Sequence, residues 1–138
     1  MSQSPIEQLL AALEGRDVDA VVALFEPDAG FLAVDGGRGK GTDAIRAMVA
    51  AYLAALRSSD YRVTAQWHQD NVWIAEVDAS YELQDWLELS SVPRAFVVRE
   101  GQRGISDLHV YGAHEQRLSD HRTGEEGMWV GERWVPPL

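Results

Sequence analysis

The sequence predicts an α+β domain in which a few helices cover one face of an antiparallel sheet. Apolar residues recur with helical spacing through most of residues 1–56, and they alternate with a period of two through most of residues 61–111. No recurrent helical pattern interrupts the second stretch, so βαβ units and a parallel sheet are not expected. At 138 residues, the chain has the size of one domain with a core of its own.

Composition and charge exclude several classes of function. The chain has no cysteine, so a disulfide framework, a thiolate metal site and a cysteine nucleophile are all excluded. Its net charge of −10, without a basic cluster, argues against binding nucleic acid or an anionic membrane. No apolar run approaches the roughly 20 residues of a membrane span, and the first ten residues do not resemble a signal peptide. We therefore expect a cytoplasmic protein.

Three helices are predicted in the first 56 residues. Ser4 and Glu7 form a capping box at the start of the first helix. Asp17 can cap the second, which Pro27 ends, and Thr42 can cap the third. The inward-facing residues are Ile6, Leu9, Leu10 and Leu13 in the first helix, Val18, Val21, Val22 and Phe25 in the second, and Ile45, Met48, Val49, Tyr52 and Leu56 in the third.

Short and long strands account for the remaining periodicity. We predict a short strand over residues 30–34 and a flexible glycine-rich turn over 35–41. A meander follows, with an Asp70-Asn71 hairpin turn after its first strand. Its later strands are expected at residues 73–83, 85–89, 92–99 and 105–111. The predicted inward faces are Tyr61, Val63, Ala65 and Trp67 in the first strand, and Trp73, Ala75, Val77, Ala79, Tyr81 and Leu83 in the second.

The pattern stops after Leu118. Residues 119–127 are polar and have the composition of a mobile segment, whereas residues 128–138 are apolar again and contain Trp129 and Trp134. So much apolar surface predicts that the tail docks. We expect a domain over residues 1–117 and a tail over 118–138 that packs on the domain or on a partner subunit.

The order of these elements resembles the SnoaL-like branch of the nuclear transport factor two-like superfamily. Residues 14–20 (EGRDVDA) precede the end of the second helix, and residues 41–46 (GTDAIR) are similar to the family's G-x-x-A-I helix entry. Gly104 and Ile105 open a last strand that ends at Tyr111. The resemblance covers residues 4–117. It implies a cone-shaped α+β barrel with an apolar pocket inside a curved sheet, often as a dimer.

The resemblance leaves two classes of function open. Family members include polyketide cyclases, ketosteroid isomerase, limonene epoxide hydrolase and scytalone dehydratase, and many others bind or assemble without chemistry. It therefore implies a small apolar molecule in the cone and no cofactor, either in an isomerase, cyclase or dehydratase or in a non-catalytic ligand-binding or dimeric assembly module. Many SnoaL-like chains end the last strand in Tyr-x-Asp, with a catalytic Asp. Here the match is Tyr111-Gly112-Ala113, so that acid/base is missing.

A substitute acid/base is offered by the last strand. Asp107, His109 and Tyr111 alternate and share one face of the sheet. Asp107 could orient His109 as a general base, while Tyr111 donates a hydrogen bond to a carbonyl. Two orientations stay open: the three residues point into the cone, or they face solvent or a dimer partner while Leu108 and Val110 face the core.

Aromatic residues define the expected ligand walls. Tyr52, Trp67, Trp73, Tyr81 and Trp86 would line a pocket for flat or apolar molecules with one or two polar handles. The histidines lack metal-ligand spacing, so no metal site is expected.

A homodimer through the outer sheet face is also expected. Val72 and Ile74 stand beside Trp73 and Ala75, so this strand has apolar residues on both faces.

Overall fold

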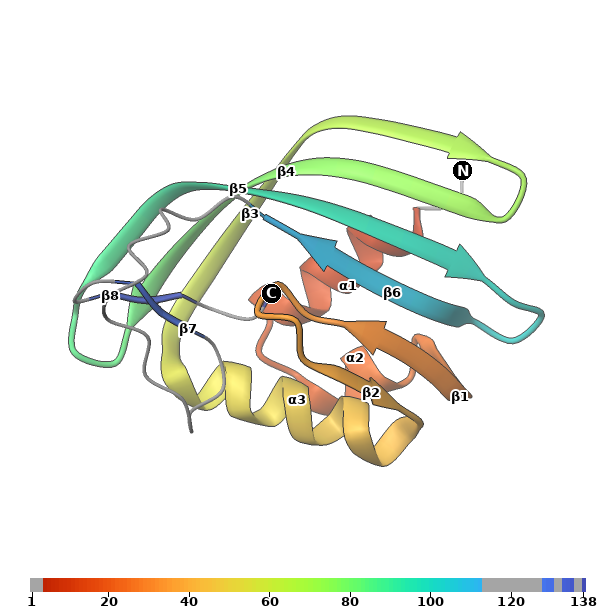
Figure 1. Cartoon of the computed structure of the whole chain (residues 1–138), viewed down its shortest axis with the longest axis horizontal. Coiled ribbons are helices and arrows are strands. Elements are labelled where there is room, and N and C mark those ends of the chain that lie inside the picture. Colours follow the sequence, from red (N-terminus) through yellow and green to blue (C-terminus); the bar gives the residue numbers. More distant parts are fainter. Residues whose placement is uncertain (1–3, 113–127, 131–132, 136–137) are drawn as a thin grey trace.

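The protein folds as an open cone made of one curved sheet and three helices on its concave side (Figure 1). The computed structural model describes residues 4–112, 128–130, 133–135 and 138. The six strands follow the order β2-β1-β6-β5-β4-β3, and the sheet does not close on itself. The predicted α+β class is confirmed.

The first two helices begin where their capping residues predict. Helix α1 spans Pro5–Glu14 and helix α2 spans Val18–Val22. The Ser4 side chain accepts a hydrogen bond from the Glu7 amide at 3.0 Å, and that of Asp17 accepts one from the Ala20 amide at 3.1 Å. All four predicted inward residues of α1 are buried. These caps satisfy amides that the first turn of a helix leaves without partners.

Helix α3 spans Thr42–Ala55 and buries its predicted stripe. The residue before it is Gly41, at φ 92°, and it provides no side-chain cap. The predicted cap at Thr42 is therefore wrong, because this hydroxyl donates to the Pro27 carbonyl at 3.3 Å instead. Leu56 is buried as expected, but its extended backbone makes it the first residue of the next strand.

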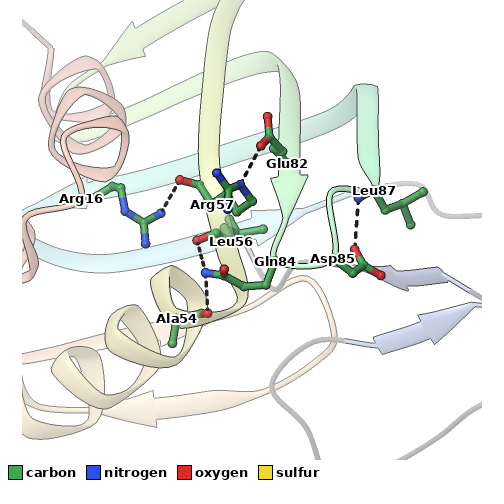
Figure 2. Close-up of polar contacts among 8 residues, drawn as sticks. All are labelled: Arg16, Ala54, Leu56, Arg57, Glu82, Gln84, Asp85 and Leu87. Carbon is green, nitrogen blue, oxygen red and sulfur yellow. Dashed lines mark hydrogen bonds and ion pairs between the residues drawn. The ribbon is translucent and has the colours of Figure 1, made fainter.

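Side chains from distant segments hold the end of α3 against the sheet (Figure 2). The Gln84 side-chain amide donates to the carbonyls of Ala54 and Leu56, at 3.2 and 3.0 Å. Arg16 donates to the Arg57 carbonyl at 3.2 Å. The Ala54 carbonyl lies in the last turn of α3, where carbonyls lack partners within the helix, and the other two lie at the start of the following strand. They fix the helix that carries Tyr52 into the interior.

The first strand differs most from its prediction. Strand β1 spans Phe25–Leu32 and pairs in parallel with β6, which spans Ile105–Tyr111. Phe25 thus opens a strand instead of closing α2, and Pro27 lies inside the strand. Its register with the last strand shifts between Phe25 and Gly30, so the missing amide of Pro27 interrupts no pairing there. Strand β2, Arg38–Lys40, occupies part of the predicted glycine-rich turn.

The remaining strands form the predicted antiparallel meander. Their bounds are β3 Leu56–Gln69, β4 Val72–Leu83, β5 Glu88–Glu100 and β6 Ile105–Tyr111. The hairpin turn at Asp70 and Asn71 is confirmed. The two strands expected at 85–89 and 92–99 are one strand, β5, because residues 84–87 only connect it to β4. A register shift beside Tyr81 lets this strand continue.

A β-bulge in β3 decides which side chains face the interior. Val63 pairs with Val77, but two residues further on Ala65 pairs with Glu76, so one residue of β3 is unpaired. Side-chain alternation is reversed beyond that point. Trp67 consequently joins the outer face and is 53% exposed. Its predicted place on the inward face is wrong.

The tail contributes a small hairpin and one core residue. Strands β7, Met128–Val130, and β8, Arg133–Val135, pair with Trp129 opposite Trp134. Leu138 is 1% exposed. The domain boundary at 117/118, the polar segment 119–127 and two histidines, His114 and His121, lie outside the described residues. None of the described helices has the length and apolarity needed to cross a membrane.

Candidate functional site

The interior of the cone holds a cluster of aromatic side chains from four elements. Tyr52 comes from α3, Tyr61 from β3, Tyr81 from β4 and Phe96 from β5, and all four are buried. Tyr61 meets the rings of Tyr81 and Phe96 edge-on, with centroids 6.1 and 6.4 Å apart. Edge-to-face contacts of this kind fix the ring positions. Tyr52 and Tyr81, two of the predicted ligand walls, are both buried in this interior.

A single arginine lies among these rings. Arg94 pairs with Val77 across β4 and β5 and is 3% exposed. Its Nη1 donates to the Pro93 carbonyl at 3.1 Å. The backbone of Gly112 lies against the guanidinium, so that a Cβ there would come within 2.4 Å of Nη1. A glycine after β6 thus makes room for the Arg94 side chain. We call Tyr52, Tyr61, Tyr81 and Arg94 the interior cluster.

Two tyrosines of the interior cluster, Tyr52 and Tyr81, stay protonated well above neutral pH. Burial raises the pKa of Tyr81 to about 12, although Arg94, which hydrogen-bonds to its side chain, lowers it. Burial also raises the pKa of Tyr52 well above its ordinary value. The buried Tyr61 hydroxyl has no hydrogen-bond partner among the described residues. The interior therefore offers neutral phenol donors beside one positive charge.

The interior cluster favours binding an oxygen atom over moving a proton. In the described part of the chain, Ser4 and Arg94 are the buried polar or charged residues, so no carboxylate or histidine is buried there. The planar donors of the guanidinium match the two oxygens of a carboxylate. The apolar walls would suit the hydrocarbon part of a ligand.

The predicted catalytic residues lie on the other face of the sheet. Leu108 and Val110 face the core, whereas Asp107, His109 and Tyr111 face outward. The second of the two open orientations is the one observed, and these residues do not point into the cone. We call Asp107, His109 and Tyr111 the outer triad.

The outer triad is nevertheless brought together. The Nε2 atom of His109 lies 3.0 Å from a carboxylate oxygen of Asp107, and its Nδ1 atom lies 3.0 Å from the Tyr111 hydroxyl. Arg99 approaches Asp107 at 3.8 Å. If Nε2 carries the proton, it donates to Asp107, and Nδ1 accepts from Tyr111. The predicted pairing of an acid, a histidine and a tyrosine is therefore present in the structure.

A cleft of about 710 Å³ adjoins the outer triad. Its lining residues are Thr64, Glu76, Val77, Asp78, Ser91, Pro93, Arg94, Ala95, Tyr111 and Gly112. Glu76, Ala95 and Tyr111 are neighbours across three strands, which places much of the cleft on the outer face. None of the five predicted aromatic walls lines it.

Two of the predicted aromatic walls, Trp67 and Trp86, lie outside the interior, whereas Trp73 packs against the core. Trp67 is on the outer face, and Trp86 is 66% exposed in the β4–β5 connection, where the Arg57 guanidinium stacks on its ring. Trp73 is partly buried near the start of β4. Its ring stacks on His68, and its Nε1 donates a hydrogen bond to the Glu100 carboxylate at 2.6 Å. Neither Trp67 nor Trp86 can line the interior as predicted. The β-bulge in β3 turns Trp67 to the outer face, and Trp86 lies in the exposed connection between β4 and β5.

Sequence reasoning missed Arg94. The signal was available, because Arg94, Phe96 and Val98 alternate and so share a face, and all three are buried. An arginine in phase with two core residues predicts a charge in the interior. Among the described residues, no group of three His, Asp or Glu side chains could hold a metal ion.

The geometry defines an α+β cone protein with a polar cluster in an apolar interior, and comparison with known proteins places it in a family. The chain belongs to the SnoaL-like domain family, whose model matches residues 6–130. No curated protein matches it.

Solved structures with the same fold have low sequence identity to this chain. A hypothetical protein from Catenulispora acidiphila with a ketosteroid isomerase-like fold, in complex with trimethylamine, is 17% identical, with a TM-score of 0.75 over 86% of this chain and 92% of that one. An M. tuberculosis LEH-like epoxide hydrolase is 16% identical, with a TM-score of 0.68 over 79% of this chain and 80% of that one. An NTF2-like protein of unknown function from Exiguobacterium is 12% identical, with a TM-score of 0.70 over 81% of this chain and all of that one. At these identities the similarity establishes the fold.

Proposed function

We propose that this protein binds a small apolar molecule inside the cone and holds an oxygen of that molecule with Arg94 and Tyr81. The observation that carries the proposal is a guanidinium at 3% exposure among aromatic rings. Burying such a charge is costly. A carboxylate or carbonyl oxygen would engage its donors, and the rings would cover the apolar part. The ligand class is therefore a flat or compact apolar acid or carbonyl compound.

Binding without catalysis is the activity that this cluster supports best. General acid/base catalysis needs a group whose pKa lies near the working pH. The raised pKa values of Tyr52 and Tyr81 and the fixed charge of Arg94 do not meet that need. The Catenulispora acidiphila neighbour, solved in complex with trimethylamine, is a precedent for a small organic molecule on this fold. The positive charge of Arg94 favours an anion here.

Titration with 2-naphthoate, a flat apolar carboxylate, tests the proposal by isothermal calorimetry. Arg94→Gln should weaken binding by about 10–100-fold, the range expected for losing a hydrogen bond to a charged group. Arg62→Gln is the matched control, because Arg62 is exposed on the outer face and pairs with Asp78 at 3.0 Å. Equal affinity of the wild type and Arg94→Gln would show that the interior cluster is not the binding site.

The outer triad supports a second candidate function, acid/base catalysis in the adjoining cleft. The favouring observation is that the chain of hydrogen bonds from Asp107 through His109 ends at Tyr111, which lines that cleft. His109 would take the hydroxyl proton of Tyr111 while the tyrosine oxygen acts on a substrate. The reactions of this class are isomerisation, cyclisation and dehydration without a cofactor.

Screening of flat apolar ketones, lactones and epoxides for turnover tests the second candidate. His109→Ala should lower kcat by about 10²–10⁴-fold, the usual contribution of a general base. His68→Ala is the control, since His68 is exposed and lies on β3, which two strands separate from β6. Wild-type turnover by His109→Ala would exclude the outer triad as the base.

We also propose that the outer face pairs two copies of the chain. One rung of the sheet joins Trp67, Ile74, Val97 and His109 across four strands, and the first two are 53% and 38% exposed. Adjacent exposed apolar side chains are typical of a surface that a partner covers. A dimer of this kind would cover His109, so it competes with catalysis by the outer triad.

A further inference from the structure

The interior cluster is already in contact with another segment of the chain. Leu138, the last residue of the sequence, is 1% exposed, and its carbonyl oxygen accepts a hydrogen bond from the buried Tyr81 hydroxyl. Tyr81 in turn hydrogen-bonds with Arg94. A branched apolar side chain and an oxygen thus occupy the place expected for a ligand.

The contact between Leu138 and the cone differs from the rest of the core. Tyr52, Tyr81 and Arg94 are fixed by the helix and the strands that carry them. Leu138 lies outside every described helix and strand, and its partner Tyr81 is 57 residues away along the chain. Its buried side chain and its hydrogen bond with Tyr81 hold it in place, and neither belongs to the backbone pairing of the sheet, so it can leave without breaking the sheet.

We propose that Leu138 occupies the ligand site of the cone and that the ligand displaces it. This proposal rests on the proposed binding function of the interior cluster. Leu138 is then an internal competitor of the ligand. The apparent affinity for a ligand is reduced by the fraction of molecules whose site is open. While Leu138 occupies the site in most molecules, the protein therefore binds a ligand more weakly than its open form does.

The occupant also specifies the ligand. Leu138 combines a compact branched hydrocarbon side chain with a carbonyl oxygen that accepts a hydrogen bond from Tyr81. A ligand that replaces it must supply the same pair of features. Apolar acids and carbonyl compounds fit, and the charge of Arg94 favours the acids. Protonated amines lack both the acceptor and the favourable charge.

Naphthoate affinity of two variants of the full chain tests the displacement. Leu138→Lys places a positive charge near Arg94 and should expel the residue, so that 2-naphthoate binds at least tenfold more tightly than to the wild type. Leu138→Met keeps an apolar side chain and should bind as the wild type does. Circular dichroism checks that each variant is folded. Equal affinity of the wild type and both variants overturns the displacement, and the Arg94 dependence of that affinity then separately decides the proposed function.

A second measurement needs no variant. The methyl signals of Leu138 in the wild type should lie at ring-shifted positions and move to the values of an exposed leucine as naphthoate saturates the protein. Saturation without any change in these signals overturns displacement while leaving the proposed function standing. If neither the wild type nor Leu138→Lys binds naphthoate, the proposed function fails and the displacement fails with it.

Discussion

The two faces of the sheet use charge in opposite ways. On the outer face, charged residues are exposed or half-buried and pair with one another, as Arg62 does with Asp78 at 3.0 Å and Arg57 with Glu82 at 2.9 Å. Inside the cone, the one buried charged residue of the described chain is Arg94. Exposed ion pairs contribute little to stability, whereas a buried charge is costly and is retained where it has a task. The interior is therefore the better place to look for function.

The contrast is also one of packing. Inward residues such as Ile45, Phe96 and Val98 are fully buried, whereas Trp67 and Ile74 leave apolar surface exposed on the outer face. A side chain inside is held by neighbours on every side, and one outside gains comparable burial only from a partner molecule. Substitutions should accordingly affect folding from the inside and association from the outside.

The largest expected effect comes from a charge in the interior. Ile45→Asp should lower the free energy of unfolding by several kcal/mol, a large part of the ~5–15 kcal/mol of a typical domain, because Ile45 is 0% exposed. Urea denaturation measures the loss. Ala47→Asp, at an exposed position of the same helix, is the control and should cost under about 1 kcal/mol. Near-wild-type stability of Ile45→Asp would contradict the burial of this helix.

The second-largest expected effect is a fall in the free energy of unfolding at alkaline pH. The folded state keeps the Tyr81 proton up to a pKa of about 12, whereas the unfolded chain loses it near 10. The unfolded state binds fewer protons in that window, so stability is fully present below pH 10 and falls as pH rises toward 12. The loss is on the order of 3 kcal/mol for this residue.

Urea unfolding midpoints measured from about pH 9 to about pH 12 test whether stability falls in this range, which spans the unfolded and folded pKa values of Tyr81. Tyr81→Phe should flatten the decline, and Tyr111→Phe, which removes an exposed hydroxyl from the outer face, should keep it. A decline that is unchanged in Tyr81→Phe would show that other groups cause it.

Crowding Arg94 should have an intermediate effect. In Gly112→Ala the new Cβ would come within 2.4 Å of Nη1 of Arg94 and 3.0 Å of the Pro93 carbonyl, so the arginine must shift. Overpacking of this kind costs about 1–3 kcal/mol. Thermal unfolding measures the cost, and naphthoate affinity should fall at the same time. Gly36→Ala is a useful contrast, because its cost would come from φ 89° and not from a neighbouring atom.

The smallest effect on folding, with the clearest effect on assembly, is expected on the outer face. Ile74→Asp should change monomer stability by less than about 1 kcal/mol while breaking the proposed dimer, because it puts charge into an apolar contact. Light scattering should then give the 15.3 kDa monomer for the variant and twice that mass for the wild type. Gln102→Asp, in an exposed loop, controls for added charge. A monomeric wild type at micromolar concentration would contradict the proposed dimer, and the outer triad would then be accessible to a substrate.

Local sequence signals predicted much of the fold. The caps at Ser4 and Asp17, the buried stripe of α3 and the bounds of β6 follow from residues near one another in the chain. The alternation of Asp107 with His109 predicted their contact, since strand geometry alone brings such neighbours together. Local periodicity did not decide which face of the sheet looks inward at β6.

Tertiary structure decided the rest. The unpaired residue in β3 placed Trp67 outside, because a slip of one residue exchanges the two faces of a strand. The contact of Leu138 with Tyr81 joins segments far apart in sequence, and no local pattern encodes it. The sequence by itself determined most of the elements, the caps at Ser4 and Asp17, and the family, since these depend on short-range chemistry. The tertiary structure alone decided that Arg94 and Leu138 meet the interior tyrosines, because strand register and long-range packing are set by the whole chain.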